Sequence, residues 1–168
     1  MVLKNQKWDK ILELLFENPN KRFTIREISK ETKIPTSSIQ RYLKSLKEEN
    51  LIDRDNKIII NEYSKFLKSS FIIEKIVKSG LIDYLDEKLN SSVIILFGGI
   101  RKGEYDNESD IDLFVESTKK IKIDLSKFEN MLKHDVQLFV EKDIKNLPDR
   151  LFNNIVNGIK LKGYLKIK

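Results

Sequence analysis

The stretch at residues 91–116 limits the fold of this 168-residue chain more than any other part of it. An unbroken apolar run at residues 93–97 is typical of a strand that is buried on both faces. Gly98 and Gly99 end that run, and glycines at such a point leave backbone N–H groups open to a phosphate. The sequence therefore predicts a buried strand that leads into a turn able to hold an anion.

A second strand is predicted to begin at Asp110 and to carry two carboxylates. Side chains at positions i and i+2 share one face of a strand, so Asp110 and Asp112 point the same way, and the aliphatic residues between them point to the opposite face. Two adjacent carboxylates repel each other unless a cation lies between them. Mg²⁺ is commonly held by one or two carboxylates together with the phosphate oxygens of a substrate. The stretch therefore predicts a site for Mg²⁺ and a triphosphate, suited to phosphoryl or nucleotidyl transfer.

The segment F-G-G-I-R-K-G-E-x4-S-D-I-D-L-F-V resembles the signature of minimal nucleotidyltransferases of the DNA polymerase β superfamily. The resemblance covers the C-terminal half of the chain, and the ending N-I-V-N-G-I-K-L-K-G-Y-L is similar to the archaeal type. It implies a nucleoside triphosphate as substrate, Mg²⁺ as cofactor and a nucleotidyltransferase fold. By resemblance, the catalytic and metal-binding residues are Asp110 and Asp112, and the nucleotide-binding residues are Gly98, Gly99, Lys102 and Ser109.

The chain departs from that signature at two positions. The serine that follows the first glycine of the family is Gly99 here, so a hydroxyl contact to phosphate is missing. The third carboxylate of the superfamily, its usual general base, falls on the next core strand, at the position of Gln137. Asp135 lies on the same face but about 6.6 Å earlier along that strand, so it could replace Gln137 only with a change of register.

Residues 1–62 are predicted to form three short helices and a hairpin. Apolar residues recur at helical spacing from residue 4 to 17, and Thr24 and Glu27 have the spacing of a capping box that opens a second helix. A third helix is expected from about residue 35 to 50. Two apolar runs on either side of residues 55–56 indicate a hairpin. This plan resembles a winged helix-turn-helix domain.

That resemblance implies binding of double-stranded DNA. A third helix with short hydroxyl residues at its start and basic residues after them suits the major groove, and the hairpin tip would contact the adjacent backbone. The alternative is that the charged face is only solvated and that the module serves protein contacts or dimerisation. The residues expected to bind DNA are Thr36, Ser37, Ser38, Gln40, Arg41, Lys44, Arg54 and Lys57.

Residues 63–90 are predicted to be a helical linker between the two domains, one face of which is apolar through Phe66, Phe71, Ile72, Ile76 and Val77. A long apolar helix at this place is also a candidate homodimer seam.

The second domain, residues 91–168, is expected to contain the two strands described above and a helix at 124–133. A strand at 135–140, a final helix at 143–160 and an edge strand at 164–167 complete it. The fold class is therefore α+β, with flanking helices around a small mixed sheet. His134 is expected to be exposed at a helix end, and Tyr105 either stacks on a base or packs internally.

The composition excludes several other classes of site and location. The chain contains no cysteine, which rules out thiolate metal sites, and the longest uncharged apolar stretch is too short to cross a bilayer. Charged residues recur from Lys4 onward, so no signal pattern is present and a cytoplasmic protein is expected. The formal charge of +6 is compatible with nucleic acid.

Two functions remain open from the sequence. The first is a DNA-binding enzyme that transfers a nucleotide to an acceptor hydroxyl, including one on a partner protein. The second is an inactive or weak relative that regulates transcription, in which the C-terminal domain binds nucleotide or dimerises.

Overall fold

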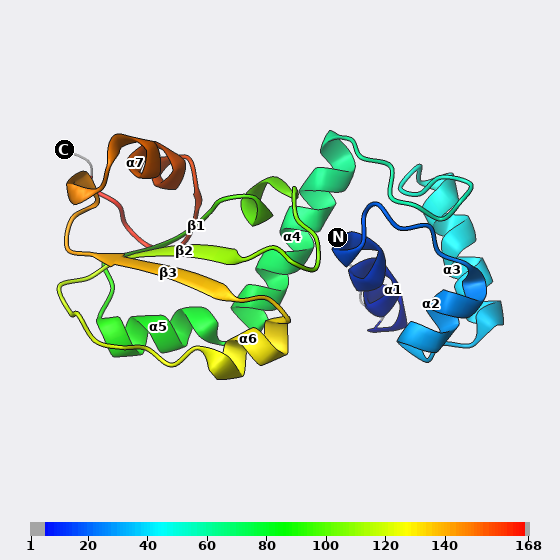
Figure 1. Ribbon diagram of the computed structural model, residues 1–168, viewed down its shortest axis with the longest axis horizontal. Helices are drawn as coiled ribbons and strands as arrows, with labels where there is room; N and C mark the ends of the chain where they lie inside the picture. The colour runs from blue at the N-terminus through cyan, green and yellow to red at the C-terminus, as the bar shows by residue number, and fades with distance from the viewer. Residues whose placement is uncertain (1–5, 167–168) are drawn as a thin grey trace. The chain divides into compact units, whose positions relative to one another are not determined.

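The computed structural model describes residues 6–166, which form two compact units (Figure 1). The N-terminal unit extends through Lys68 and also includes Tyr105–Asn107. The C-terminal unit consists of Ser69–Glu104 together with the chain from Glu108 onward. The boundary between the units falls inside one continuous helix, α4 (Glu62–Lys78).

Three helices make up most of the N-terminal unit: α1 (Gln6–Glu17), α2 (Ile25–Thr32) and α3 (Thr36–Glu48). The predicted capping box is confirmed, since the Thr24 hydroxyl accepts a hydrogen bond from the Glu27 N–H and the Glu27 carboxylate accepts one from the Thr24 N–H. Apolar residues at helical spacing pack these helices together, and residues 4 and 5 of the predicted first helix lie outside the described residues.

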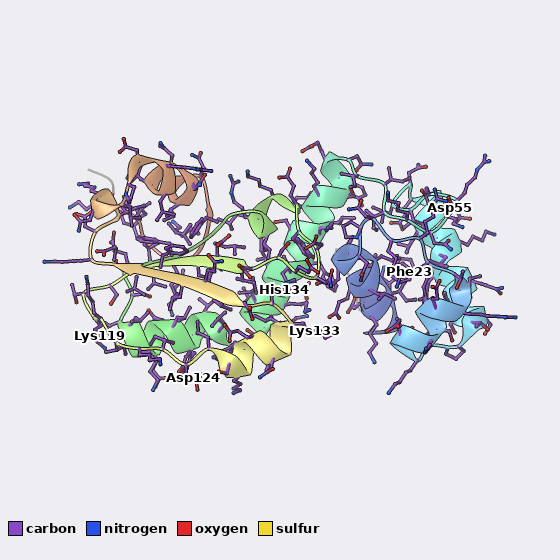
Figure 2. The ribbon with its side chains drawn as sticks, in the orientation of Figure 1. Phe23, Asp55, Lys119, Asp124, Lys133 and His134 are labelled. Carbon is purple, nitrogen blue, oxygen red and sulfur yellow. The ribbon has the colours of Figure 1, made fainter. Side chains whose placement is uncertain are left out.

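The predicted hairpin is much reduced. A single antiparallel bridge joins Ile52 to Ile58. The turn between them is closed by the Asp53 carboxylate, which accepts hydrogen bonds from the N–H groups of Asp55 and Lys57. Asn56 has a positive φ of 59° and donates its side-chain amide to the Phe23 carbonyl, which ties the turn to the segment before α2. Figure 2 shows Phe23 and Asp55 in this unit.

A four-stranded sheet forms the centre of the C-terminal unit. Its strands are β1 (Val93–Phe97), β2 (Ile111–Glu116), β3 (Val136–Glu141) and β4 (Ile159–Gly163), in the order β3-β2-β1-β4. β1 runs antiparallel to both of its neighbours, whereas β2 and β3 are parallel, so the predicted mixed sheet is confirmed. All five residues of β1 are buried, as expected of a central strand with an unbroken apolar run.

Helices cover both faces of this sheet (Figure 1). On one face, Ile155 of α7 (Asp149–Val156) and Ile144 of the short 3₁₀ helix η2 (Ile144–Asn146) pack with Phe114 and the side chains of β1. On the other face lie α5 (Leu81–Leu89) and α6 (Ser126–Leu132), which contact each other through the Tyr84 and Phe128 rings, 5.0 Å apart. No helix in the described part of the chain is long and apolar enough to cross a membrane.

The predicted end of the chain is wrong in detail. Instead of one helix over 143–160 and an edge strand at 164–167, the chain forms η2, α7 and then β4, whose last residue is Gly163. Pro148 lies at the N-cap of α7, where its missing N–H does no harm. Gly158 ends the helix against β1, because a Cβ there would lie 2.4 Å from the Ile95 side chain. Residues 159–163 therefore pair with β1 instead of extending the helix; residue 167 lies outside the described residues.

Candidate functional site

Asp110 and Asp112 lie where β2 begins. Ile111, Leu113 and Val115 are fully buried on the opposite face, so the two aspartates share a face as the period-two pattern predicts. Asp112 is half-buried and lies in register with Phe97 of β1 on one side and Gln137 of β3 on the other. The sheet register therefore brings the end of β1 and the starts of β2 and β3 to one place.

Gly98 makes room for the Asp112 carboxylate. Its φ is +75°, and a Cβ at this position would lie only 1.9 Å from Oδ2 of Asp112. A side chain at residue 98 and the carboxylate of Asp112 cannot occupy the same space, so glycine is needed here for both its backbone angle and its lack of a side chain. The turn after β1 and the start of β2 are thus packed against each other.

Gly99 has a different structural reason to be glycine. Its carbonyl accepts hydrogen bonds from the N–H groups of Lys102 (3.0 Å) and Glu104 (3.1 Å), which closes a tight turn around the 3₁₀ helix η1 (Ile100–Lys102). A Cβ at residue 99 would lie 2.9 Å from the Glu104 carbonyl oxygen, so the serine of the family signature would need a shift of the backbone. The glycine that replaces the serine of the family signature therefore removes the hydroxyl and also allows a tighter turn.

The electrostatics of the aspartate pair are unfavourable without a cation. Burial, and secondly the charge of Asp110, raise the pKa of Asp112 above its ordinary value. Within the part of the chain that the structure describes, the Asp112 carboxylate accepts no hydrogen bond and forms no ion pair. A divalent cation bound to these carboxylate oxygens would offset both the burial of the Asp112 charge and its repulsion by Asp110. The donor set therefore fits one Mg²⁺ that is shared with phosphate oxygens.

Gln137, the residue that the resemblance matches to the third carboxylate of the superfamily, lies directly beside Asp112 in the parallel register. Its side-chain amide donates a hydrogen bond to Oδ2 of Asp110. The carbonyl of Asp135 accepts the Ile111 N–H at 2.8 Å, which fixes the register and leaves Asp135 two residues away from the matching position. Among the described residues, no cluster of three or more acidic or histidine side chains is arranged to hold a metal.

The other residues expected to bind nucleotide, Lys102 and Ser109, are connected less directly to the aspartate pair. Lys102 is exposed on η1, and its side chain forms no hydrogen bond or ion pair within residues 6–166. Ser109 precedes Asp110, and its carbonyl lies 2.6 Å from Nδ1 of His134. Because a carbonyl only accepts hydrogen bonds, Nδ1 carries the proton in this contact.

The structure corrects one expectation from the sequence, for His134, and decides between the two alternatives given for Tyr105. His134 was expected to be exposed, but it is buried between α6 and the start of β3, where Figure 2 labels it, and it supports the Ser109 backbone beside the aspartate pair. Nothing in the sequence pattern marked this role, since it depends on a contact between residues 25 positions apart. Tyr105 is also buried and belongs to the N-terminal unit, so it packs internally and is not free to stack on a base.

The exposed face of α3 carries the residues expected to bind DNA. Ile39, Leu43 and Leu46 are buried, as their spacing predicted. Pro35 gives the helix no side-chain cap, so the first N–H groups of α3 point outward without a side-chain acceptor. Apart from Ser38 and Lys57, which are partly buried, the predicted DNA-binding residues are exposed, namely Thr36, Ser37, Gln40, Arg41, Lys44 and Arg54.

A hollow of about 500 Å³ lies beside this face. Gln40, Lys44 and Lys47 line it from α3, and Asn56 lines it from the turn. The Lys47 ammonium also donates to the Arg54 carbonyl at 3.2 Å, which connects α3 to that turn. Glu48 also lines the hollow, 3.9 Å from the Lys44 ammonium, so the lining carries one negative charge beside the two lysines.

Comparisons with known families agree with the two-unit fold. Residues 78–161 match the nucleotidyltransferase domain family, and residues 7–61 match a helix-turn-helix (HTH) domain family. The first match covers half of the chain, so the protein belongs to the nucleotidyltransferase domain family, and it carries an HTH domain before that domain. Searches of curated proteins and of solved structures gave no match. Together the two domains support a DNA-binding protein with a nucleotidyltransferase-like domain.

Proposed function

We propose that this protein binds a nucleoside triphosphate with Mg²⁺ at Asp110 and Asp112 and transfers a nucleotide to an acceptor hydroxyl, while its HTH domain binds double-stranded DNA. The observation that carries the proposal is the half-buried Asp112, which has no compensating partner among the described residues and faces Asp110 beside the glycine turn. A fixed pair of charges of one sign in a chain that folds is best explained by a bound cation.

The residues of the site have different roles in this proposal. Asp110 and Asp112 would hold the cation, which neutralises triphosphate charge when it is bound. Gly98 leaves space for the Asp112 carboxylate. The N–H groups of the glycine turn would bind the phosphates. Gln137 orients Asp110 through its amide. In the transfer, the acceptor oxygen would bond to the α-phosphorus while the bond to the β-phosphate breaks and pyrophosphate leaves. The proton of the acceptor hydroxyl would pass to water, because the Gln137 amide is not a base.

A second candidate is a regulator that binds nucleotide but does not transfer it. The hydrogen bond from Gln137 to Asp110 favours this reading, since a neutral amide occupies the place where the general base of the superfamily is expected. In this case nucleotide binding is the regulatory signal, and DNA binding by the HTH domain responds to it. Both candidates require the same Mg²⁺ and nucleotide site, and they differ only in turnover.

The first test is calorimetric titration with ATP and with GTP, with and without Mg²⁺. We expect binding that depends on Mg²⁺ and is lost in Asp110→Asn. Asp135→Asn is the matched control, because it removes an exposed carboxylate just before β3 and should bind like wild type. If neither nucleotide binds to the wild-type protein, the site does not exist in this form.

The second test separates the two candidates. Gln137→Glu restores a carboxylate beside Asp112, and transfer of labelled nucleotide to protein or nucleic acid is measured for this variant and for wild type. Transfer by wild type supports the enzyme. Transfer by the variant alone supports the regulator, with catalysis disabled at this one position.

A further inference from the structure

The backbone on both sides of Asp110 is held by two consecutive residues of the segment that joins α6 to β3. The Ser109 carbonyl, which belongs to the peptide unit before Asp110, accepts a hydrogen bond from the His134 ring at 2.6 Å. The Ile111 N–H, which belongs to the peptide unit after Asp110, donates to the Asp135 carbonyl at 2.8 Å. Because each peptide unit is planar, these two hydrogen bonds together restrict φ and ψ of Asp110.

The strand alone does not restrict Asp110 in this way. β2 begins at Ile111, so its register with β3 includes Asp112 but stops one residue before Asp110. The hydrogen bond from His134 therefore acts at the point where the backbone ladder has ended. The His134 side chain is only 4% exposed, and a hydrogen bond inside a protein is stronger than the same bond in water.

The turn that carries His134 is anchored at both of its ends. Lys133 closes α6 with a φ of 63°, and its N–H donates to the Glu129 carbonyl at 2.7 Å. The Glu129 carboxylate accepts the Val136 N–H at 3.1 Å, where β3 begins. Figure 2 labels Lys133 and His134 in this turn. The His134 ring is therefore attached to a segment that α6 and the sheet both hold in place.

We propose that His134 is a positioning residue for the cation site. It holds the backbone of Asp110 so that the carboxylates of Asp110 and Asp112 bind one Mg²⁺ together. This inference rests on the proposed function and adds to it a residue that does not touch the ligand. Gln137 contacts the Asp110 carboxylate, whereas His134 fixes the backbone that carries it. Residues that orient a metal ligand commonly change metal affinity about 10–100-fold when they are replaced.

The alternative is that the His134 ring only fills space, and two substitutions separate the two roles. His134→Asn keeps a nitrogen donor on Cγ, where histidine has Nδ1, so it can still donate to the Ser109 carbonyl. His134→Leu fills the space without a donor. Phe128→Leu is the matched control, because it changes a buried ring of α6 that has no hydrogen-bonding group.

Amide hydrogen exchange, measured by NMR on the full chain without Mg²⁺ or nucleotide, tests the positioning itself. We expect His134→Leu to raise the exchange rate of the Ile111 amide roughly tenfold relative to the Phe114 amide of the same strand, because the start of β2 opens locally. His134→Asn should restore most of the protection, and Phe128→Leu should leave the ratio of the two rates unchanged. An unchanged ratio in His134→Leu would overturn the proposal.

The Mg²⁺ dependence of nucleotide binding is the second readout, measured by calorimetric titration with ATP and with GTP. We expect His134→Leu to need about tenfold more Mg²⁺ than wild type for half-maximal binding. His134→Asn and Phe128→Leu should stay close to wild type. If wild type binds and His134→Leu needs no more Mg²⁺ than wild type, the positioning role is wrong and the proposed function stands. Absence of binding by wild type would overturn both.

Discussion

Lys68 in the N-terminal unit and Asp112 in the C-terminal unit are both ionisable groups that burial pushes toward the neutral form. Burial lowers the pKa of Lys68 to about 8 and raises the pKa of Asp112. The difference lies in what surrounds each charge. Lys68 is compensated by the protein, whereas Asp112 is not.

Lys68 is only 4% exposed, yet its ammonium has partners within the protein. Nζ donates to the Tyr105 carbonyl at 2.6 Å and lies 4.4 Å from the centre of the Tyr105 ring. The charges of Glu17 and Asp106 partly restore its pKa. The Tyr105 hydroxyl in turn donates to the Lys68 carbonyl. This lysine therefore fixes the loop at residues 105–107 within its own unit and has a structural role.

Asp112 has the opposite surroundings: the charge that acts on it is another carboxylate, and the residue packed against it, Gly98, has no side chain that could donate a hydrogen bond. A shifted pKa alone would mark both residues as functional. The comparison shows that the useful signal is a buried charge without compensation, because only such a charge gains from a ligand of opposite sign.

Gly98→Ala is expected to have the largest effect. The new Cβ would collide with Oδ2 of Asp112, and the alanine would have to adopt a positive φ. We therefore expect a loss of about 1–3 kcal/mol in the free energy of unfolding and no measurable binding of nucleotide with Mg²⁺. Gly80→Ala is the control, since Gly80 has a φ of +79° but nothing within 4 Å of its Cβ position. Urea unfolding and calorimetry of both variants separate the effect of the Cβ collision, which only Gly98→Ala has, from the effect of backbone strain, which both variants have. Equal effects of the two substitutions would contradict the packing of Asp112 on Gly98.

Lys68→Met tests the compensated charge. The folded pKa is about 8 and the ordinary value is 10.5, so between these pH values the unfolded chain binds more protons and the wild type gains stability as pH rises. We expect a gain on the order of 1 kcal/mol after solvent screening, measured by urea unfolding across this range, and no such gain in the variant. Lys65→Met, on the same helix, should keep the wild-type slope. Identical slopes in wild type and Lys68→Met would show that Lys68 is not the group that titrates.

Asp112→Asn tests the uncompensated charge. Because the folded pKa is raised, the contribution of Asp112 to stability is complete below the ordinary value of 3.8 and is lost as pH rises through the folded pKa. Without Mg²⁺, the variant should therefore unfold at a slightly higher urea concentration than wild type at neutral pH, by less than about 1 kcal/mol for a partly exposed group. Addition of Mg²⁺ should stabilise only the wild type. A variant that is equally stabilised by Mg²⁺ would place the cation elsewhere.

The smallest change in stability is expected on the exposed face of α3, where charges have little desolvation to compensate. Arg41→Ala and Lys44→Ala should each leave the free energy of unfolding within about 0.5 kcal/mol of wild type. Each should reduce the slope of log K against log salt for DNA by about one, as measured by fluorescence anisotropy. Lys127→Ala, an exposed lysine in the C-terminal unit, removes the same charge and should leave the slope unchanged. If both α3 variants bind DNA like wild type, α3 is not the DNA-binding helix.

The sequence by itself determined the features that depend on local periodicity. The capping box at Thr24, the buried stripe of α3 and the alternation around Asp112 were all predictable, because each depends on residues within a few positions of one another. The resemblance to the nucleotidyltransferase signature singled out Gln137, and the parallel register then placed it beside Asp112.

Only the tertiary structure decided the contacts between distant segments. It replaced the end of the predicted last helix with β4, since the pairing of residues 159–163 with β1 depends on an edge that is 60 or more residues away in the chain. It buried His134 against Ser109 and Tyr105 against Lys68, and it left Phe66 and Val77 of α4 exposed, although they were expected on its apolar face. Periodicity shows which residues can share a face, but what covers that face is decided by segments that meet only when the chain folds.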